Sequence, residues 1–158
     1  MTILQGVQIA AQGIHSVAVV ILVGGLFRGY MAVSPMSGDY TKSSGLQLAQ
    51  GALRRFFPWV WISILVLPVT GYVVMFATYG SFAAAPFYIN LMQAISWVMI
   101  ALFAWLFFVP WREFKFHIDA EKWSAAGANL ARIDKINLVN LLLGIIAVVT
   151  GSTGPYWQ

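Results

Sequence analysis

The sequence predicts an all-α integral membrane protein: a four-transmembrane-helix bundle with both termini outside, on the periplasmic side. The first observation is composition, because the chain is 60% apolar and only 9% charged, whereas soluble domains average about a quarter charged residues. The second is that charge-free segments of membrane-spanning length alternate with short charged windows. The third is that Lys and Arg occur in only two of the connections between these segments.

Three segments carry no charged side chain: residues 1–27, 56–111 and 136–158. A transmembrane helix needs about 20 apolar residues, so the outer segments fit one span each and the middle one fits a hairpin of two. The last span is expected to begin in the charged window, where Asp119 is a suitable N-cap. We expect one domain over residues 1–158, with helices at about 4–30, 56–78, 87–111 and 120–151.

All nine Lys and Arg residues lie between the first and second spans or between the third and fourth. The positive-inside rule places both of these loops in the cytoplasm. We therefore expect a multi-pass protein of the bacterial inner (plasma) membrane, with the lipid bilayer as its main partner. This topology accounts for the net charge of +4, which gives no reason to expect nucleic-acid binding.

Several local features refine this outline. Pro68 lies in the middle of the second span and predicts a kink, while residues 46–53 suggest a short interfacial helix before it. His117 is interpreted as a solvated loop residue. Asn137 and Asn140 share one face of the last span, where such pairs usually hydrogen-bond between helices.

The most informative polar residue is His15, inside the first span. It shares one helix face with three glutamines, at the helical spacing of Gln5, Gln8, Gln12 and His15. A polar stripe that leads to an imidazole within the membrane is costly, and by default it indicates a functional site.

His15 lies roughly 15 Å deep if the helix rises 1.5 Å per residue. The same count places three small residues at that level: Gly71, Ser96 and Gly144. Small residues there have two explanations. They allow close helix packing around a His15 that hydrogen-bonds to Ser96 or a glutamine, or they leave a slot for a flat ligand or a metal.

Met75, Met92 and Met99 lie within about two turns of this level. Thioethers together with an imidazole suit Cu(I), although methionine is also an ordinary filler of membrane helices. His117 is roughly 20–30 Å from His15 by helical rise, so the two cannot ligate one metal within a chain. The sequence also has no cysteine and no P-loop or H-E-x-x-H motif.

Four stretches of the chain resemble a known family: H-x8-G-G from His15 to Gly25, R-F-F-P-W at 55–59, T-G-Y at 70–72 and A-R-I-D-K-I-N-L-V-N-L-L-L-G at 131–144. They are similar to the copper-resistance D (CopD) superfamily, which includes the HemJ type of protoporphyrinogen oxidase. In its haem-binding branch the first-helix histidine is an axial ligand, which implies His15. A basic residue near the last helix is also implicated, which implies Arg132 or Lys135. The copper branch implies copper movement across the inner membrane with a periplasmic copper protein.

The leading hypothesis is a non-covalent haem b with His15 as axial ligand, in a redox or haem-handling subunit of a homo-oligomer or larger complex. Its cofactor-binding residues would be His15, Gln12, Gly71, Ser96, Gly144, Arg132 and Lys135. The first alternative is copper transport or tolerance, with His15, Met75, Met92 and Met99 as metal ligands and a periplasmic copper or redox protein as partner. The second is a structural subunit without a cofactor. Enzymatic activity, as in protoporphyrinogen oxidases, stays open.

Overall fold

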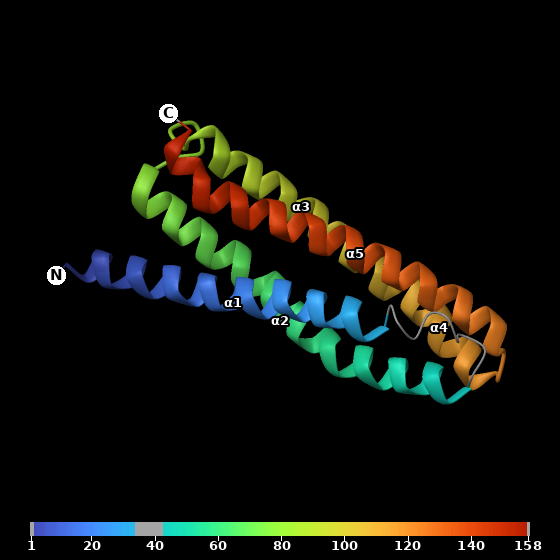
Figure 1. Ribbon diagram of the computed structural model, residues 1–158. Coiled ribbons are helices and arrows are strands. Elements are labelled where there is room, and N and C mark those ends of the chain that lie inside the picture. Colours follow the sequence, from blue (N-terminus) through green and yellow to red (C-terminus); the bar gives the residue numbers. More distant parts are fainter. Residues whose placement is uncertain (1, 34–42, 158) are drawn as a thin grey trace.

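The computed structural model describes residues 2–33 and 43–157, and every regular element in these ranges is helical (Figure 1). In chain order they are α1 (Ile3–Val33), α2 (Ser43–Tyr79), α3 (Phe87–Phe108), α4 (Pro110–Asp119), α5 (Trp123–Thr153) and the short 3₁₀ helix η2 (Gly154–Tyr156). Four stretches are long and apolar enough to cross a membrane: Ile3–Gly29, Ser43–Tyr79, Phe87–Asp119 and Trp123–Tyr156. The expected all-α, four-span fold is confirmed.

The helices pack mainly in two groups. α1 lies along α2, whereas α5 lies along α3 and α4, and α1 also contacts α5. Both chain ends and the α2–α3 connection lie at one end of the bundle, and α4 lies at the other (Figure 1). Consecutive spans therefore run in opposite directions, as expected for short connections between transmembrane helices.

The second helix is longer than expected, because it begins at Ser43 and not near residue 56. The stretch 46–53 is the first part of α2, so the expected separate interfacial helix is wrong. Its apolar residues explain the continuity: Leu46, Ala49 and Leu53 are all buried in the main core. Their spacing of three and four residues forms one buried helix face.

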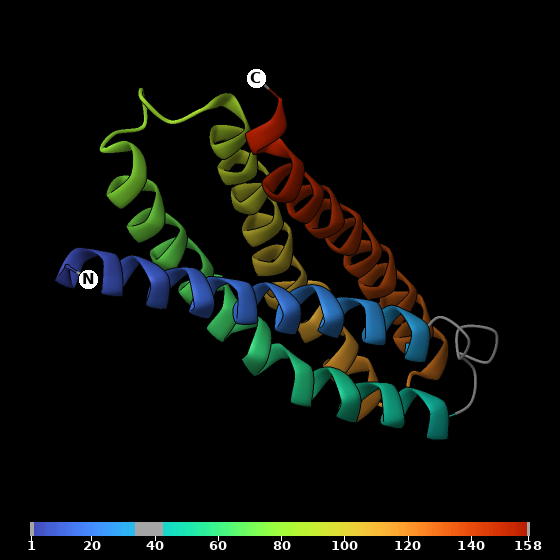
Figure 2. The ribbon, with the colours of Figure 1, turned by 60° about the vertical axis from the view of Figure 1, so that its left-hand side comes forward.

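α2 continues through Pro68. Figure 2 shows that α2 changes direction in its middle, in the stretch that carries this proline. The bend agrees with the expected kink, since an internal proline removes a helix hydrogen bond and clashes with the preceding turn.

The third and fourth spans differ from the sequence expectation at their charged ends. α3 stops at Phe108, and Pro110 starts α4, where its missing N–H costs little. α4 ends at Asp119, and Lys122 precedes α5, so the expectation that Asp119 caps the last helix is wrong. Glu121 turns the chain between them with φ of 56°.

His117 lies in the last turn of α4, so its interpretation as a solvated loop residue is wrong. The side chain is half-buried, and its Nδ1 is enclosed without a hydrogen-bond partner among the described residues.

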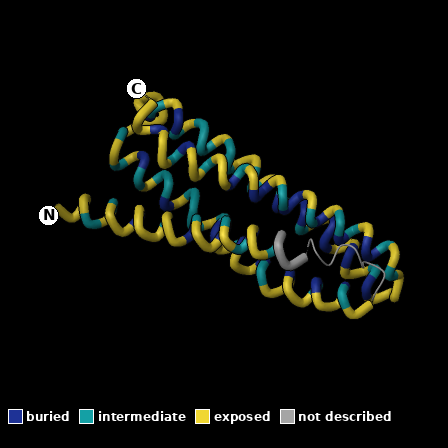
Figure 3. The backbone as a smooth tube through the Cα atoms, in the orientation of Figure 1, coloured by how far each residue is buried: buried dark blue, intermediate teal, exposed yellow. Residues whose placement is uncertain are grey.

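An aromatic cluster joins α2 to α3 and α4: Phe57, Trp61, Phe103, Phe107 and Trp111. Phe57 is 2% exposed and makes edge-to-face contacts with three of these rings at centroid distances of 5.5, 5.7 and 5.0 Å. Buried positions are concentrated in this half of the bundle (Figure 3). Packing is therefore tightest toward α4, away from the chain termini.

Candidate functional site

A cavity of about 610 Å³ lies among α1, α2, α3 and α5. Its lining includes most of the residues singled out in the sequence: Gln12, His15, Gly71, Met75, Met92, Ser96, Met99 and Gly144. No Asp, Glu, Lys or Arg is among the described residues that line it. The site is therefore a charge-free cavity with one imidazole and three thioethers in its walls.

The imidazole of His15 is oriented by α2. Its Nδ1 lies 2.9 Å from Oγ1 of Thr70, and that oxygen lies 2.7 Å from the Val66 carbonyl. A carbonyl can only accept, so the Thr70 hydroxyl donates its proton to α2 and accepts from His15. Nδ1 then carries the ring proton, and in the neutral ring Nε2 is the unprotonated nitrogen.

Ser96 and the glutamines do not hold the imidazole, so this part of the sequence interpretation is wrong. The hydroxyl of Ser96 donates to the Met92 carbonyl at 2.8 Å. Sequence reasoning missed Thr70 as the partner. The available signal was the T-G-Y stretch, in which Thr70 directly precedes Gly71.

Gly71 lies against the imidazole, at the depth expected from the sequence. A Cβ atom at Gly71 would lie 3.3 Å from Cε1 and 3.7 Å from Nδ1 of His15. The absence of a side chain therefore lets the ring approach the α2 backbone and reach Thr70.

Gly144 lines the same cavity as His15, but its neighbour on α1 is Val23 and not His15. A Cβ atom at Gly144 would lie 3.2 Å from Cγ2 of Val23 and 3.4 Å from Cε of Met99. Val23 is two helical turns beyond His15 along α1. The count by helical rise assumed parallel helices, whereas α1 crosses α5 at an angle (Figure 2).

The three methionines line the cavity from two helices. Met92 and Met99 are seven residues apart on α3, about 10 Å along the helix. Met92 covers Gly151, where a Cβ would lie 3.1 Å from its sulfur, and Met75 on α2 is 3% exposed. The thioethers therefore occur at different depths in the cavity.

The glutamine stripe continues the cavity toward the N-terminal end of α1. Gln5, Gln8 and Gln12 line a neighbouring surface depression, and Gln12 also lines the main cavity. The amide of Gln8 donates to Oγ1 of Thr78 at 2.9 Å. Amide groups thus connect the end of the bundle to His15.

Two asparagines on α5 have incomplete hydrogen bonding. Asn137 is 5% exposed and Asn140 is 2% exposed, yet neither Oδ1 has a partner among the described residues. The expected interhelical hydrogen bonds through these oxygens are therefore not formed. An unsatisfied buried acceptor costs about 1–3 kcal/mol, and Asn140 lies in the cavity wall.

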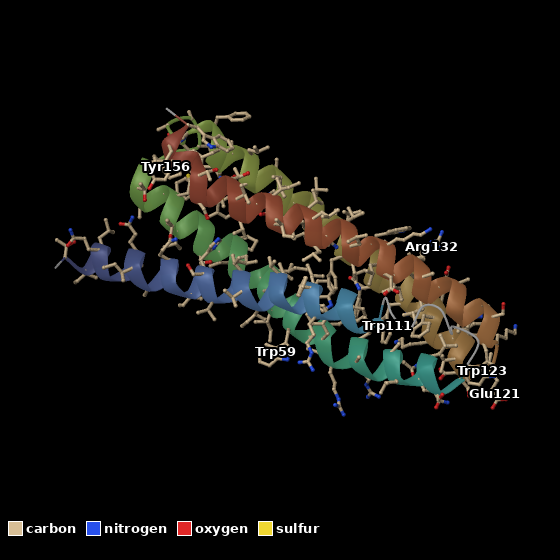
Figure 4. All side chains as sticks on the ribbon, in the orientation of Figure 1. Trp59, Trp111, Glu121, Trp123, Arg132 and Tyr156 are labelled. Atoms are coloured by element: carbon tan, nitrogen blue, oxygen red, sulfur yellow. The ribbon has the colours of Figure 1, made fainter. Side chains whose placement is uncertain are left out.

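Arg132 and Lys135 do not line the cavity. The guanidinium of Arg132 lies 3.8 Å from Oε2 of Glu113 and is positioned over the Trp105 ring, and Lys135 is exposed. Figure 4 shows Arg132 in the half of the bundle that contains α4, far from the end marked by Tyr156. The structure does not bring these cations together with His15.

Four membrane-spanning helices around a charge-free internal cavity define an integral membrane protein with a site within its bundle. The family model described as copper resistance protein D matches residues 50–153, more than half of the chain. The protein therefore belongs to the copper resistance protein D family. The matched range begins within α2, so α1 and His15 lie outside it. No curated protein and no solved structure matches the chain.

Proposed function

We propose that this protein binds monovalent copper in its membrane cavity and acts in copper transport or tolerance. The observation that carries the proposal is one charge-free cavity that contains an oriented imidazole and three thioethers. Nitrogen and thioether ligands suit Cu(I), and none of the described side chains in the cavity wall is a cation that would repel it. The description of the matched family, copper resistance, supports the same assignment.

Copper in this proposal is the cargo of the protein and not a resident cofactor. Met92 and Met99 are too far apart along α3 to ligate one ion, since about 10 Å separates them. We therefore propose successive positions, in which His15 Nε2 with nearby thioethers provides the middle one. Thr70 holds the imidazole in the tautomer that leaves Nε2 free, as hydrogen-bonded partners of metal-ligating histidines commonly do.

Metal content and the visible spectrum of the purified protein test this function. After loading with Cu(I) under reducing conditions and removal of free ions, we expect at least one retained copper per chain and no Soret band. A Soret band without copper would favour the haem alternative. A purified protein that retains no copper and shows no Soret band would overturn both the copper and the haem proposals.

Haem b is the second candidate. The volume of about 610 Å³ falls within the roughly 300–1,000 Å³ typical of ligand sites, and His15, which lines the cavity, would be the axial ligand. The charge-free walls count against it, because haem propionates are anionic and no Lys or Arg is among the described residues that line the cavity. In this alternative the protein would be a redox or haem-handling subunit.

We also propose that both charged connections face the cytoplasm of a bacterium and that the glutamine stripe opens to the periplasm. A periplasmic copper or redox protein would then exchange cargo at that end, with this chain working in a homo-oligomer or larger complex. A reporter enzyme that is active only in the periplasm, fused after Gln158, should be active. Activity only of a cytoplasmic reporter would contradict this orientation.

A further inference from the structure

Asn140 on α5 lines the inner part of the cavity, together with the apolar side chains of Leu26, Val60 and Phe103. We propose that this inner part is a hydrogen-bonding site that holds ordered water. The cavity is then an aqueous vestibule that reaches the middle of the membrane. The vestibule does not depend on whether copper, haem or neither binds at His15.

The first support is the buried amide itself. Asn140 lines the cavity and is 2% exposed, and its Oδ1 has no described partner. Asn137, one turn further along α5, has the same deficit. Rotating the side-chain amide of an asparagine by 180° exchanges the positions of its oxygen and nitrogen, and the choice between the two orientations is made from the hydrogen bonds around them. Either polar atom of Asn140 can therefore face the cavity.

The second support is depth. Asn140 lies 13 residues before the end of α5 at Thr153, about 20 Å along the helix. A bilayer has a hydrocarbon core about 30 Å thick, so Asn140 lies inside this core, roughly two-thirds of the way across it from the end of α5. Lipid chains offer no hydrogen-bond donor there, and buried polar groups in proteins are normally satisfied by protein or ordered water.

The third support is the polar lining of the outer part of the cavity. Gln12, His15, Tyr79, Gln93 and Ser96 all line the same cavity. A buried water needs two to four polar partners, and this lining provides them in the part of the cavity toward the glutamine stripe. The cavity volume is also far larger than the roughly 30 Å³ that one water occupies in the liquid.

The vestibule ends at the aromatic cluster. Phe103 lines the cavity and also contacts Phe57 and Trp61 at centroid distances of 5.5 and 5.4 Å. These closely packed rings separate Asn140 from the charged end of the bundle. Water and ligands therefore exchange through the uncharged end.

Cysteine labelling tests the vestibule, because the natural chain contains no cysteine. Asn140→Cys is compared with Leu142→Cys, which is 51% exposed on the outer surface at nearly the same depth. Both metal-free proteins are placed in phosphatidylcholine vesicles with a charged, membrane-impermeant methanethiosulfonate reagent on both faces.

Only a hydrated thiol ionises readily to the reactive thiolate. We therefore expect Asn140→Cys to be labelled at least about tenfold faster than Leu142→Cys. Equal rates, or no labelling of Asn140→Cys, would show that lipid or packed side chains fill the cavity, and would overturn the proposal.

A stability measurement keeps the proposal testable if the cysteine variant folds poorly. In a dry cavity, Asn140→Leu would remove an unsatisfied amide and raise the melting temperature by about 2–4 °C or more. A hydrated Asn140 has its hydrogen bonds, so we expect no such increase. A clear rise would contradict the vestibule without bearing on copper binding at His15.

Discussion

His15→Ala should abolish copper retention by the purified protein. His15 is the only histidine among the described residues that line the cavity, and Thr70 accepts from its Nδ1, which leaves Nε2 unprotonated. The thioethers that remain are at different depths along the cavity, so they do not replace it. We expect the apparent Cu(I) affinity, measured by competition with a Cu(I) chelator, to fall by more than about 100-fold.

Two further variants make this result specific. Thr70→Val keeps the shape of the side chain but removes the acceptor of the His15 Nδ1 proton, so we expect an intermediate loss of about 10–100-fold. His117→Ala lies on α4, outside the cavity lining, and should leave the affinity unchanged. If His15→Ala binds copper as tightly as the natural protein, the proposed site is wrong.

Phe57→Ala should produce the largest loss of stability. The Phe57 ring is 2% exposed and contacts Phe103, Phe107 and Trp111 edge to face. Removing it leaves a void between α2 and the α3–α4 region and breaks these three edge-to-face contacts. We expect the free energy of unfolding in mixed detergent micelles to fall by about 3 kcal/mol.

The matched control is Phe108→Ala, because Phe108 is 55% exposed on the outer surface. It contacts Phe107 and Trp61, so we expect a loss below about 1 kcal/mol. A similar loss for both variants would show that the aromatic cluster is not the centre of packing.

The spans could be predicted because the energetic rule behind them is simple. Charged side chains are excluded from the hydrocarbon core, so charge-free segments of sufficient length locate the helices. The buried start of α2 escaped this reasoning because its first turns lie before Arg54 and Arg55. Leu46 and Leu53 are held there by packing against the core, which the charge pattern does not encode.

The site was predictable in part. His15 stood out as a polar residue within a span. Gly71 was predicted to lie beside it because a count by helical rise places both residues at the same depth in the membrane. Thr70 was missed because threonine commonly bonds to its own helix, and the second bond, to His15, depends on the angle between α1 and α2. Gly144 lies beside Val23 and not beside His15 for the same reason: helical rise gives depth only when helices run parallel.

X-ray absorption at the copper edge of the Cu(I)-loaded protein is the sharpest test of the proposed site. We expect copper bound by one imidazole nitrogen together with thioether sulfur, and loss of the imidazole signal in His15→Ala. Copper bound without an imidazole ligand, or a natural protein that retains no copper, would contradict the proposal.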